Sequence, residues 1–150
     1  MKIALGSDHG GFKLKEELKI YLKNLNIKYT DFGCTSDAPI DYTDIGFEVA
    51  YEVQKGQYDK GILICGTGIG MSIVANKVKG IRAALCQDIF SARLAREHNN
   101  ANILTLGGRI ISGELAVKIV KVWLYTDFSM DERHLNRLNK ISKEENKIYK

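Results

Sequence analysis

Cys65 and the residues after it form the part of the sequence best suited to chemistry. Cys65 ends the apolar run Ile62–Ile64, and glycines follow at alternate positions, Gly66, Gly68 and Gly70. An apolar run bounded by turn residues is typical of a buried parallel strand. Glycines beyond such a strand turn backbone N–H groups toward a ligand, and a following helix presents its positive end there. Residues 66–70, named the glycine cradle here, are predicted to hold an anion or oxyanion beside the thiol.

Two common nucleotide-binding motifs do not fit this stretch. The dinucleotide pattern G-x-G-x-x-G needs a third glycine where Met71 stands, and the Walker pattern needs a Lys-Ser or Lys-Thr pair after the glycines. A different alternative stays open on spacing alone, because a free cysteine at the end of a strand is often only a small buried hydrophobe.

Further polar residues stand next to helix ends. Asp8 and His9 precede Gly10-Gly11, where Asp8 could serve a ligand or simply cap the next helix. His98 and Asn99 end another predicted helix, a position that suits both residue types for structural reasons alone.

Arg133 and Arg137 are four residues apart in the last predicted helix, so their side chains project from the same face. Two guanidinium groups placed in this way can bind a phosphate through paired hydrogen bonds. The alternative is a solvated face, with the arginines paired to Asp131 and Glu132.

The hydrophobic pattern predicts strands alternating with helices. We expect strands at 2–7, 27–32, 62–64, 82–86 and 102–106, and helices from about 12–25, 43–55, 70–78, 89–97, 112–123 and 131–147, with Thr43 and Ser112 as N-caps. This order predicts a three-layer α/β/α fold with a five-stranded parallel, Rossmann-like sheet and an extra C-terminal helix. Ligands in such folds bind beyond the carboxyl ends of the strands. That edge should collect Asp8, the glycine cradle and Arg109, and Tyr42 belongs there only if its loop lies close.

The composition is ordinary for a globular protein, and the 150 residues predict a single domain. A net charge of +4 with scattered lysines does not indicate nucleic acid binding. Cys34, Cys65 and Cys86 have no CxxC spacing, which predicts neither disulfides nor a metal site, and Cys34 and Cys86 are interpreted as structural. No apolar run is long enough to span a membrane, and no signal peptide is evident, so we expect a cytoplasmic protein.

Taken together, these motifs resemble the type B ribose-5-phosphate isomerases, a family that includes allose- and galactose-6-phosphate isomerases. The resemblance rests on Asp8–Gly11, Cys65–Gly70, His98-Asn99 and the pattern Arg133-His134-x-x-Arg137, in order along nearly the whole chain. Some members replace the cysteine with a glutamate from the following helix. This chain has Ser72-Ile73-Val74 there, which is similar to the cysteine-using branch, and it departs from the common pattern in having Thr43 rather than proline after Tyr42.

The resemblance implies an aldose–ketose isomerisation through an enediolate, with no metal and no organic cofactor. Cys65 would be the base, with the positive helix end favouring its thiolate, and the cradle amides, including Ile69, would hold the oxyanion. The other implied roles are ring opening for Thr67 and His98, hydroxyl binding for Asp8 and Tyr42, sugar contact for Asn99 and Ser72, and phosphate binding for His9, Arg109, Arg133 and Arg137.

The substrate predicted from this resemblance is ribose 5-phosphate, which would be interconverted with ribulose 5-phosphate. Galactose-type subunits typically lose one of these site residues, whereas this chain keeps the set. Allose 6-phosphate stays an alternative, since it differs by one hydroxymethylene. Two further alternatives are a non-catalytic phosphosugar-binding module, disfavoured by the intact Cys65, and a dinucleotide-binding domain, disfavoured by the broken fingerprint.

The predicted helix 89–97 also bears on oligomeric state. It starts at the ligand-binding edge and rises about 15 Å at 1.5 Å per residue, which takes His98 to the opposite edge of the sheet. His98 should therefore not reach Cys65 of its own chain, although the chemistry needs both at one sugar. A two-fold dimer with shared active sites, or a dimer of dimers, resolves this conflict. The resemblance points the same way for Asn99 and Arg109.

Overall fold

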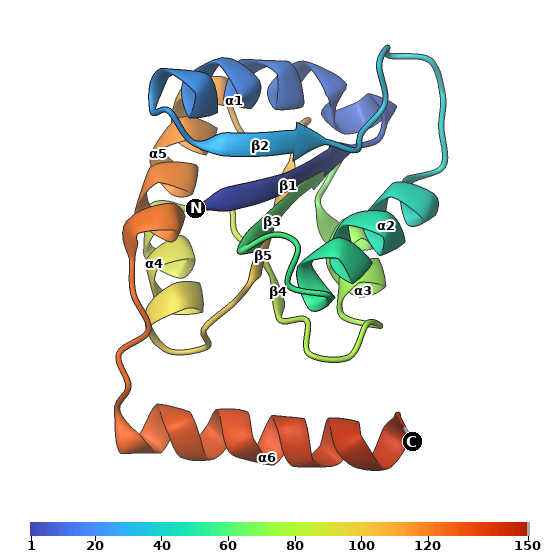
Figure 1. The fold of residues 1–150 in the computed structure, drawn as a ribbon. Helices are drawn as coiled ribbons and strands as arrows, with labels where there is room; N and C mark the ends of the chain where they lie inside the picture. Colours follow the sequence, from blue (N-terminus) through green and yellow to red (C-terminus); the bar gives the residue numbers. More distant parts are fainter. Residues whose placement is uncertain (150) are drawn as a thin grey trace.

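The computed structural model describes residues 1–149, which form a five-stranded parallel sheet between layers of helices, as predicted (Figure 1). The strand order is β2-β1-β3-β5-β4. The strands are β1 (Lys2–Ser7), β2 (Lys28–Asp31), β3 (Lys60–Cys65), β4 (Ala83–Leu85) and β5 (Ile103–Gly107). The helices are the 3₁₀ turn η1 (His9–Gly11), α1 (Phe12–Asn24), α2 (Tyr42–Gln54), α3 (Ile69–Ala75), α4 (Ile89–Glu97), α5 (Gly113–Tyr125) and α6 (Glu132–Ile148).

Alternate residues of the central strands point to opposite faces of the sheet, and both faces are covered. Ile62 and Ile64 of β3 pack into a core with α1, α4 and α5, where Trp123 is fully buried. Leu63 and Cys65 face the other core, which α2 and α3 complete. The Cys65 side chain therefore lies on the side of the sheet that carries α2 and α3.

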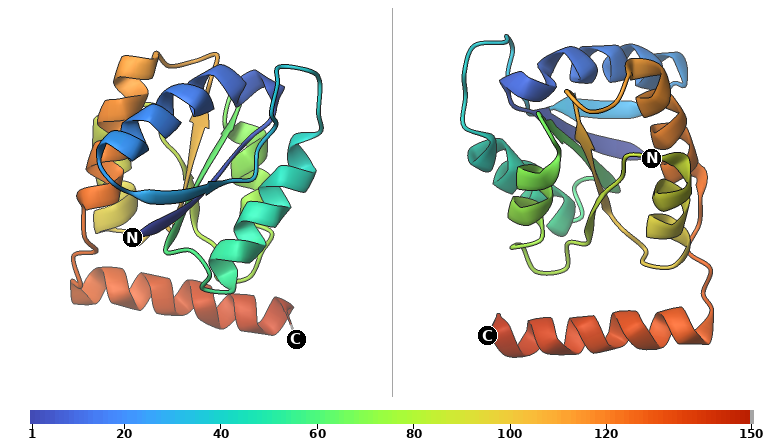
Figure 2. Two further views of the ribbon diagram at one scale, coloured as in Figure 1. Left: turned by 45° about the horizontal axis from the view of Figure 1, so that its top comes forward. Right: turned by 180° about the vertical axis from the view of Figure 1, so that it is seen from behind.

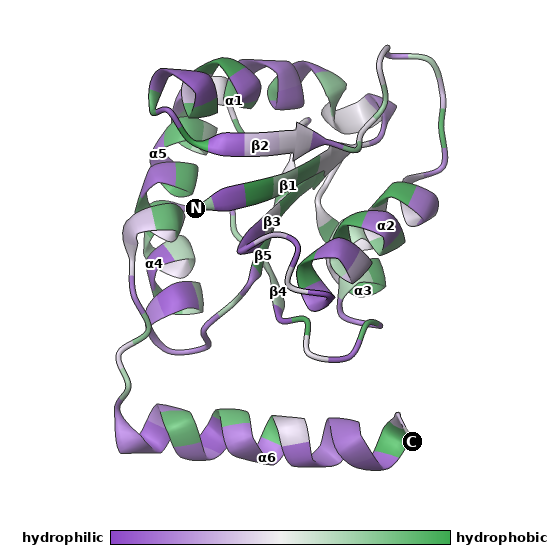
Figure 3. Ribbon diagram, in the orientation of Figure 1, coloured by the Kyte–Doolittle hydropathy of each residue, from purple (hydrophilic) through white to green (hydrophobic). Residues whose placement is uncertain are grey.

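Helix α6 lies outside these layers, below the edge of the sheet where the strands begin (Figures 1 and 2). Most of its residues are hydrophilic, with separate apolar positions along the helix (Figure 3). Near its C-terminal end, the Tyr149 hydroxyl donates to the Lys77 carbonyl at 2.9 Å, and Glu145 accepts from Gly80 N–H at 3.2 Å. These contacts attach α6 to the segment between α3 and β4.

Most predicted boundaries agree with the structure to within two residues, but two local expectations were wrong. Asp41, not Thr43, caps α2: its carboxylate accepts from the Thr43 N–H at 2.9 Å and from the Thr43 hydroxyl at 2.8 Å. Helix α3 ends at Ala75, because the chain turns there, and so Val78 packs into the core from outside the helix. Ser112 caps α5 as predicted.

Two asparagine side chains hold the short strand β4 at the border of the sheet. Asn76 bonds to both the N–H and the carbonyl of Ala83 at 2.9 Å, in place of a neighbouring strand. Asn102 accepts from Arg82 N–H at 2.8 Å and donates to the Gly80 carbonyl at 2.9 Å. None of the helices in residues 1–149 is both long and apolar enough to cross a membrane.

Candidate active site

The Cys65 thiol lies at the C-terminal end of β3 and is 6% exposed. The backbone N–H of Gly68 donates a hydrogen bond to Cys65 Sγ at 3.1 Å, where negative charge on a thiolate would reside. Gly68 has φ of 78°, in the left-handed region that favours glycine, and it is the N-cap of α3. The alternate glycines thus turn the chain back over the sulfur, as expected for a cradle.

Glycines bring the ends of three strands into contact at this edge. A side chain on Gly10 would meet the Gly66 nitrogen at 2.9 Å, and one on Gly108 would meet the Gly10 carbonyl oxygen at 2.6 Å. The loops after β1, β3 and β5 therefore pack backbone against backbone. This contact places Asp8, the cradle and Arg109 together, as the rule for parallel sheets predicted.

Asp8 is 7% exposed, and its carboxylate accepts a hydrogen bond from Gly11 N–H at 3.1 Å. The capping role that was weighed as an alternative is therefore real. One carboxylate can accept several hydrogen bonds, so capping and contact with a substrate hydroxyl are compatible. His9 is half-buried, and its Nδ1 accepts from the Ile40 N–H at 3.3 Å. That hydrogen bond joins the residue after Asp8 to the loop that precedes α2.

The structure answers the question that the sequence left open for Tyr42. Its ring lies over the cradle, because a side chain on Gly70 would meet Tyr42 Cε2 at 2.7 Å and the hydroxyl oxygen at 3.2 Å. Tyr42 occupies the first turn of α2, and the Asp41 cap fixes that turn. Tyr42 therefore belongs to the cradle edge.

Arg109 also lies against the cradle of its own chain. Its backbone N–H donates to the Gly66 carbonyl at 3.0 Å, and its Nη1 is 3.4 Å from the position of a side chain on Gly66. Arg109 lies there because the β5 loop folds directly onto the β3 loop, a contact that spacing in the sequence does not reveal. The expectation that Arg109 serves a partner subunit's site stays a prediction.

The remaining predicted cradle residues surround the start of α3. The hydroxyl of Thr67, an exposed residue, accepts from Ile69 N–H at 3.3 Å, and Ile69 itself is 51% exposed. Ser72 is half-buried, and its hydroxyl is 3.5 Å from the side-chain nitrogen of Asn76. Thr67 therefore lies at the open rim of the cradle, while Ser72 lies deeper along α3.

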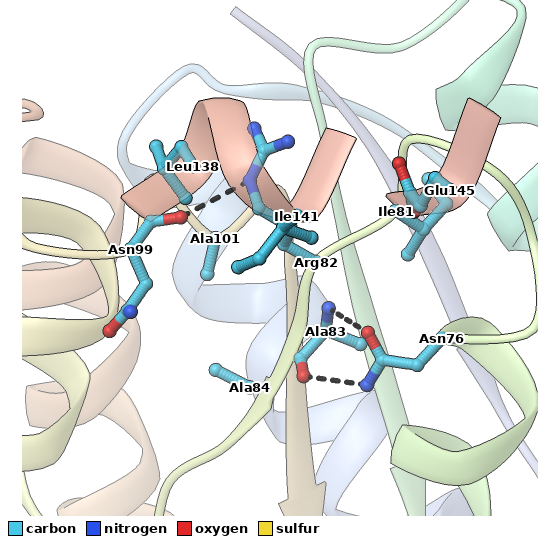
Figure 4. A pocket seen from close by; sticks show the side chains of 10 residues that line it. All are labelled: Asn76, Ile81, Arg82, Ala83, Ala84, Asn99, Ala101, Leu138, Ile141 and Glu145. Atoms are coloured by element: carbon cyan, nitrogen blue, oxygen red, sulfur yellow. Dashed lines mark hydrogen bonds between the residues drawn. The ribbon is translucent and has the colours of Figure 1, made fainter. Parts of the chain in front are cut away.

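His98, Asn99, Arg133 and Arg137 lie elsewhere. Arg82, which precedes β4, donates from Nε to the carbonyls of Asn99 and Asn100 at 3.1 and 3.0 Å (Figure 4). Asn99 therefore lies beside the starts of the strands, whereas Cys65 ends β3, a strand that rises about 16 Å at 3.3 Å per residue. Asn99 and Cys65 of one chain are thus separated by the length of the sheet, as the rise of the helix at 89–97 led us to expect.

We name residues His98, Asn99, Arg133 and Arg137 the far-edge group. The His98 and His134 rings are in contact, with centroids 4.2 Å apart and planes tilted by 32°, which joins the end of α4 to the start of α6. Arg133 is 3.7 Å from Asp131 and 67% exposed, so part of the solvated-face alternative is realised. A cavity of about 360 Å³ lies beside this group, lined by Leu138 and Ile141 of α6 and by Arg82 and Asn99 (Figure 4).

Sequence reasoning missed Arg82 and Arg96, which help to hold the far-edge group, and it named His134 only within the Arg133-His134-x-x-Arg137 pattern, without a role. Arg96 is 8% exposed and donates from Nη1 to Asn100 Oδ1 at 2.9 Å and to the Ala101 carbonyl at 2.6 Å. These contacts stabilise the turn at Asn100, where φ is 46°. For Arg96, the only available signal was an arginine within a helix stripe, which does not distinguish a buried arginine from a surface one.

The three cysteines differ in environment. Cys86 follows β4 and is 1% exposed, and its burial raises the pKa of the thiol to about 11. Cys34 is buried, with its sulfur 3.8 Å from the Ser7 hydroxyl. Cys65 is the one that carries a backbone donor on its sulfur, which supports the interpretation of the others as structural. No group of three or more His, Cys, Asp or Glu side chains in residues 1–149 could hold a metal ion.

A thiol that accepts a backbone N–H, with a buried carboxylate and a tyrosine ring at the same edge of the sheet, forms a site suited to proton transfer beside a carbonyl group. The family model described as Ribose/Galactose Isomerase matches residues 3–141. The chain therefore belongs to the ribose/galactose isomerase family.

Three relatives within this family carry names that specify a substrate. A ribose-5-phosphate isomerase B structure from Clostridium thermocellum has a TM-score of 0.96 and 49% identity, covering 99% of each chain. Ribose-5-phosphate isomerase B from Mycoplasma genitalium, with bound ribulose-5-phosphate, has a TM-score of 0.92 and 42% identity over 97% of this chain and 96% of that one. D-erythrulose-4-phosphate isomerase from Pectobacterium atrosepticum is 45% identical over 130 residues, 85% of each chain.

Proposed function

We propose that this protein is a cofactor-independent isomerase that interconverts ribose 5-phosphate and ribulose 5-phosphate, the aldose–ketose step of the pentose phosphate pathway, in the cytoplasm. The observation that carries the proposal is the hydrogen bond from the Gly68 N–H to Cys65 Sγ. The side chains of Asp8, Tyr42 and Arg109 lie around the cradle that holds this sulfur. The similarity to proteins named ribose-5-phosphate isomerase B supports the choice of sugar.

The proposed reaction begins with the open-chain aldose, whose C1 carbonyl oxygen lies in the cradle. The Cys65 thiolate takes the proton from C2, the C2–H electron pair forms the C1–C2 double bond, and O1 becomes the enediolate oxygen. Cradle amides stabilise that charge where it develops. The proton on O2 then passes to O1, and the thiol returns its proton to C1. The product is the ketose, and the Cys65 thiolate is regenerated.

Ring opening must precede this step and needs an acid and a base. Thr67, at the rim of the cradle, and His98 are the proposed groups. Because His98 lies at the other edge of its own chain, we propose a homodimer in which each far-edge group reaches the partner's cradle. Asn99 would then contact the sugar, Arg133 and Arg137 would bind its phosphate, and His9 and Arg109 would approach the phosphate from the cradle's own chain.

Exposed apolar residues support the dimer. Ile69 and Ile73 of α3 are 51% and 57% exposed, and Phe90 at the start of α4 is 70% exposed. These three large side chains follow the ends of β3 and β4, on elements next to the cradle, where a partner would cover them. A hydrophobic surface beside an active site is a common sign of a protein interface.

The test of substrate is steady-state turnover of ribose 5-phosphate beside allose 6-phosphate and galactose 6-phosphate, with the ketose product measured directly. We expect the highest kcat/KM for ribose 5-phosphate. Binding of these sugars without turnover would instead indicate a phosphosugar-binding module. Faster turnover of a six-carbon substrate would keep the chemistry and replace the assigned sugar.

A further inference from the structure

His134 lies directly beneath His98 in the far-edge region. The ring centroids are 4.2 Å apart and the ring planes differ by 32°. His134 is 2% exposed, whereas the His98 side chain keeps 32% of its surface open. The His134 ring is therefore buried, whereas the His98 ring is accessible to a molecule that binds at the surface.

The buried ring is held from the side by the connection between α5 and α6. Its Nδ1 is 2.7 Å from the Ser129 hydroxyl, which also accepts the Asp131 N–H at 3.2 Å. The Ser129 N–H donates to the Glu97 carbonyl at 3.0 Å, next to His98 in the chain. Rotation of the His134 ring would break its hydrogen bond with the Ser129 hydroxyl, which is itself held by the connection, so this contact fixes the orientation of the ring.

The charges around the pair disfavour a proton on His134. Burial lowers the pKa of His134, and the positive charges of His98, Arg133 and Arg137 lower it further, while Asp131 alone raises it. From α4, Glu97 faces the open ring, with its Oε1 3.7 Å from His98 Nε2. Two imidazolium rings at this distance would repel each other, so the pair accommodates one proton more easily than two.

We propose that His134 is a positioning residue for His98: its neutral, buried ring fixes the plane of the His98 imidazole and leaves the pair's proton to His98. The link to ring opening rests on the proposed function, since it is there that His98 acts as an acid. An aromatic pair with this spacing has a preferred geometry, so removing one ring frees the other to rotate. A freely rotating His98 would be in the productive orientation for less of the time.

The direct test follows the imidazole ¹³C–¹H resonances of the intact protein by NMR as the pH falls from 8 to 5. The chain has three histidines, so assignment needs only His9→Gln and His134→Phe. We expect the His98 resonance to move first and that of His134 only at lower pH. If His134 takes the proton before His98, the proposal is overturned, and this readout does not depend on the enzyme's substrate.

The kinetics of two variants distinguish a role of His134 in orienting His98 from a general role in stability. His134→Ala removes the ring, and we expect kcat to fall roughly tenfold with KM changed less than about twofold, as the loss of an aromatic pair allows. His134→Phe keeps a neutral ring and should recover most of that loss, with an unchanged pH profile. The matched control is Leu135→Ala, which shortens a half-buried neighbour on α6 and should leave kcat near wild type.

Three outcomes would refute the proposal: equal losses in His134→Ala and Leu135→Ala, no recovery in His134→Phe, or a His134→Ala protein with unchanged kcat. If His134→Ala does not fold, the NMR titration of the wild type and the His134→Phe kinetics still decide it. If the protein proves inactive on every sugar phosphate, the proposed function fails, while the order of protonation still tests the pair.

Discussion

The two edges of the sheet carry chemistry in different ways. At the cradle edge, Cys65 and Asp8 are buried, and backbone groups held by close glycine contacts satisfy them. At the far edge, Arg133 and Asn99 are exposed, and the contacts between elements are made by side chains such as His134 and Arg96. The difference indicates that the part of the site proposed to stabilise charge is built into the fold, whereas the part proposed to bind sugar and phosphate is exposed at the surface.

This contrast predicts which changes should be most damaging. Cys65 is the proposed base and is held in a rigid cradle, so Cys65→Ala should lower kcat by at least about 10²-fold with KM largely unchanged. Cys86→Ala is the control, because that thiol is buried behind β4 and should not affect turnover. Chelators should also have no effect, since no proposed step uses a metal. Near-normal turnover of Cys65→Ala would remove the thiol from the mechanism.

The separation of the edges can be tested by mixing subunits. Cys65→Ala and His98→Ala chains, each nearly inactive, are unfolded together and refolded as a mixture. Random pairing makes half of the dimers mixed, and each mixed dimer has one intact site of two, so about a quarter of wild-type activity should return. Activity equal to the average of the two separate mutants would mean that His98 acts within its own chain.

Because Arg133 and Arg137 are exposed at the far edge, a conservative change at Arg137 should have a smaller effect on activity than the loss of Cys65. Arg137→Lys keeps the charge but loses the planar pair of donors, so we expect KM for ribose 5-phosphate to rise roughly tenfold. Slow turnover of free ribose should not change, because it has no phosphate to bind. Lys140→Arg, on the exposed surface of the same helix, is the matched control. Equal losses on both substrates would assign Arg137 a structural role instead.

The smallest expected effect is on how the free energy of unfolding depends on pH. Because the folded chain lowers the pKa of His134 from 6.5, the unfolded chain binds a proton there more readily as the pH falls below 6.5. The contribution of His134 to the free energy of unfolding should therefore be fully present above that pH and be lost as the pH falls below it. Urea unfolding at pH 7.5, 6.5 and 5.5 should show a shallower decrease in His134→Phe than in the wild type. Parallel decreases in the two proteins would show that His134 titrates normally.

Local features were predictable from sequence because their causes lie within a few residues. The alternation of strands and helices, the Ser112 cap and the return of the Gly68 amide over Cys65 all depend on neighbours in the chain. The position of His98 was also predictable, because a helix of known rise starting at one edge must end near the other. The Asp41 cap was missed by two residues, since Asp41 and Thr43 are both good caps and bond to each other.

Tertiary structure decided everything that joins distant loops. Tyr42 meets Gly70, and Arg109 lies over Gly66 of its own chain, because the strand order β2-β1-β3-β5-β4 and the contacts of Gly10 and Gly108 bring those loop ends together. Likewise, the contact between the His134 and His98 rings depends on where the connection after α5 directs α6. Spacing along a chain determines which residue types follow one another, but the distance between two loops is set only when the sheet packs.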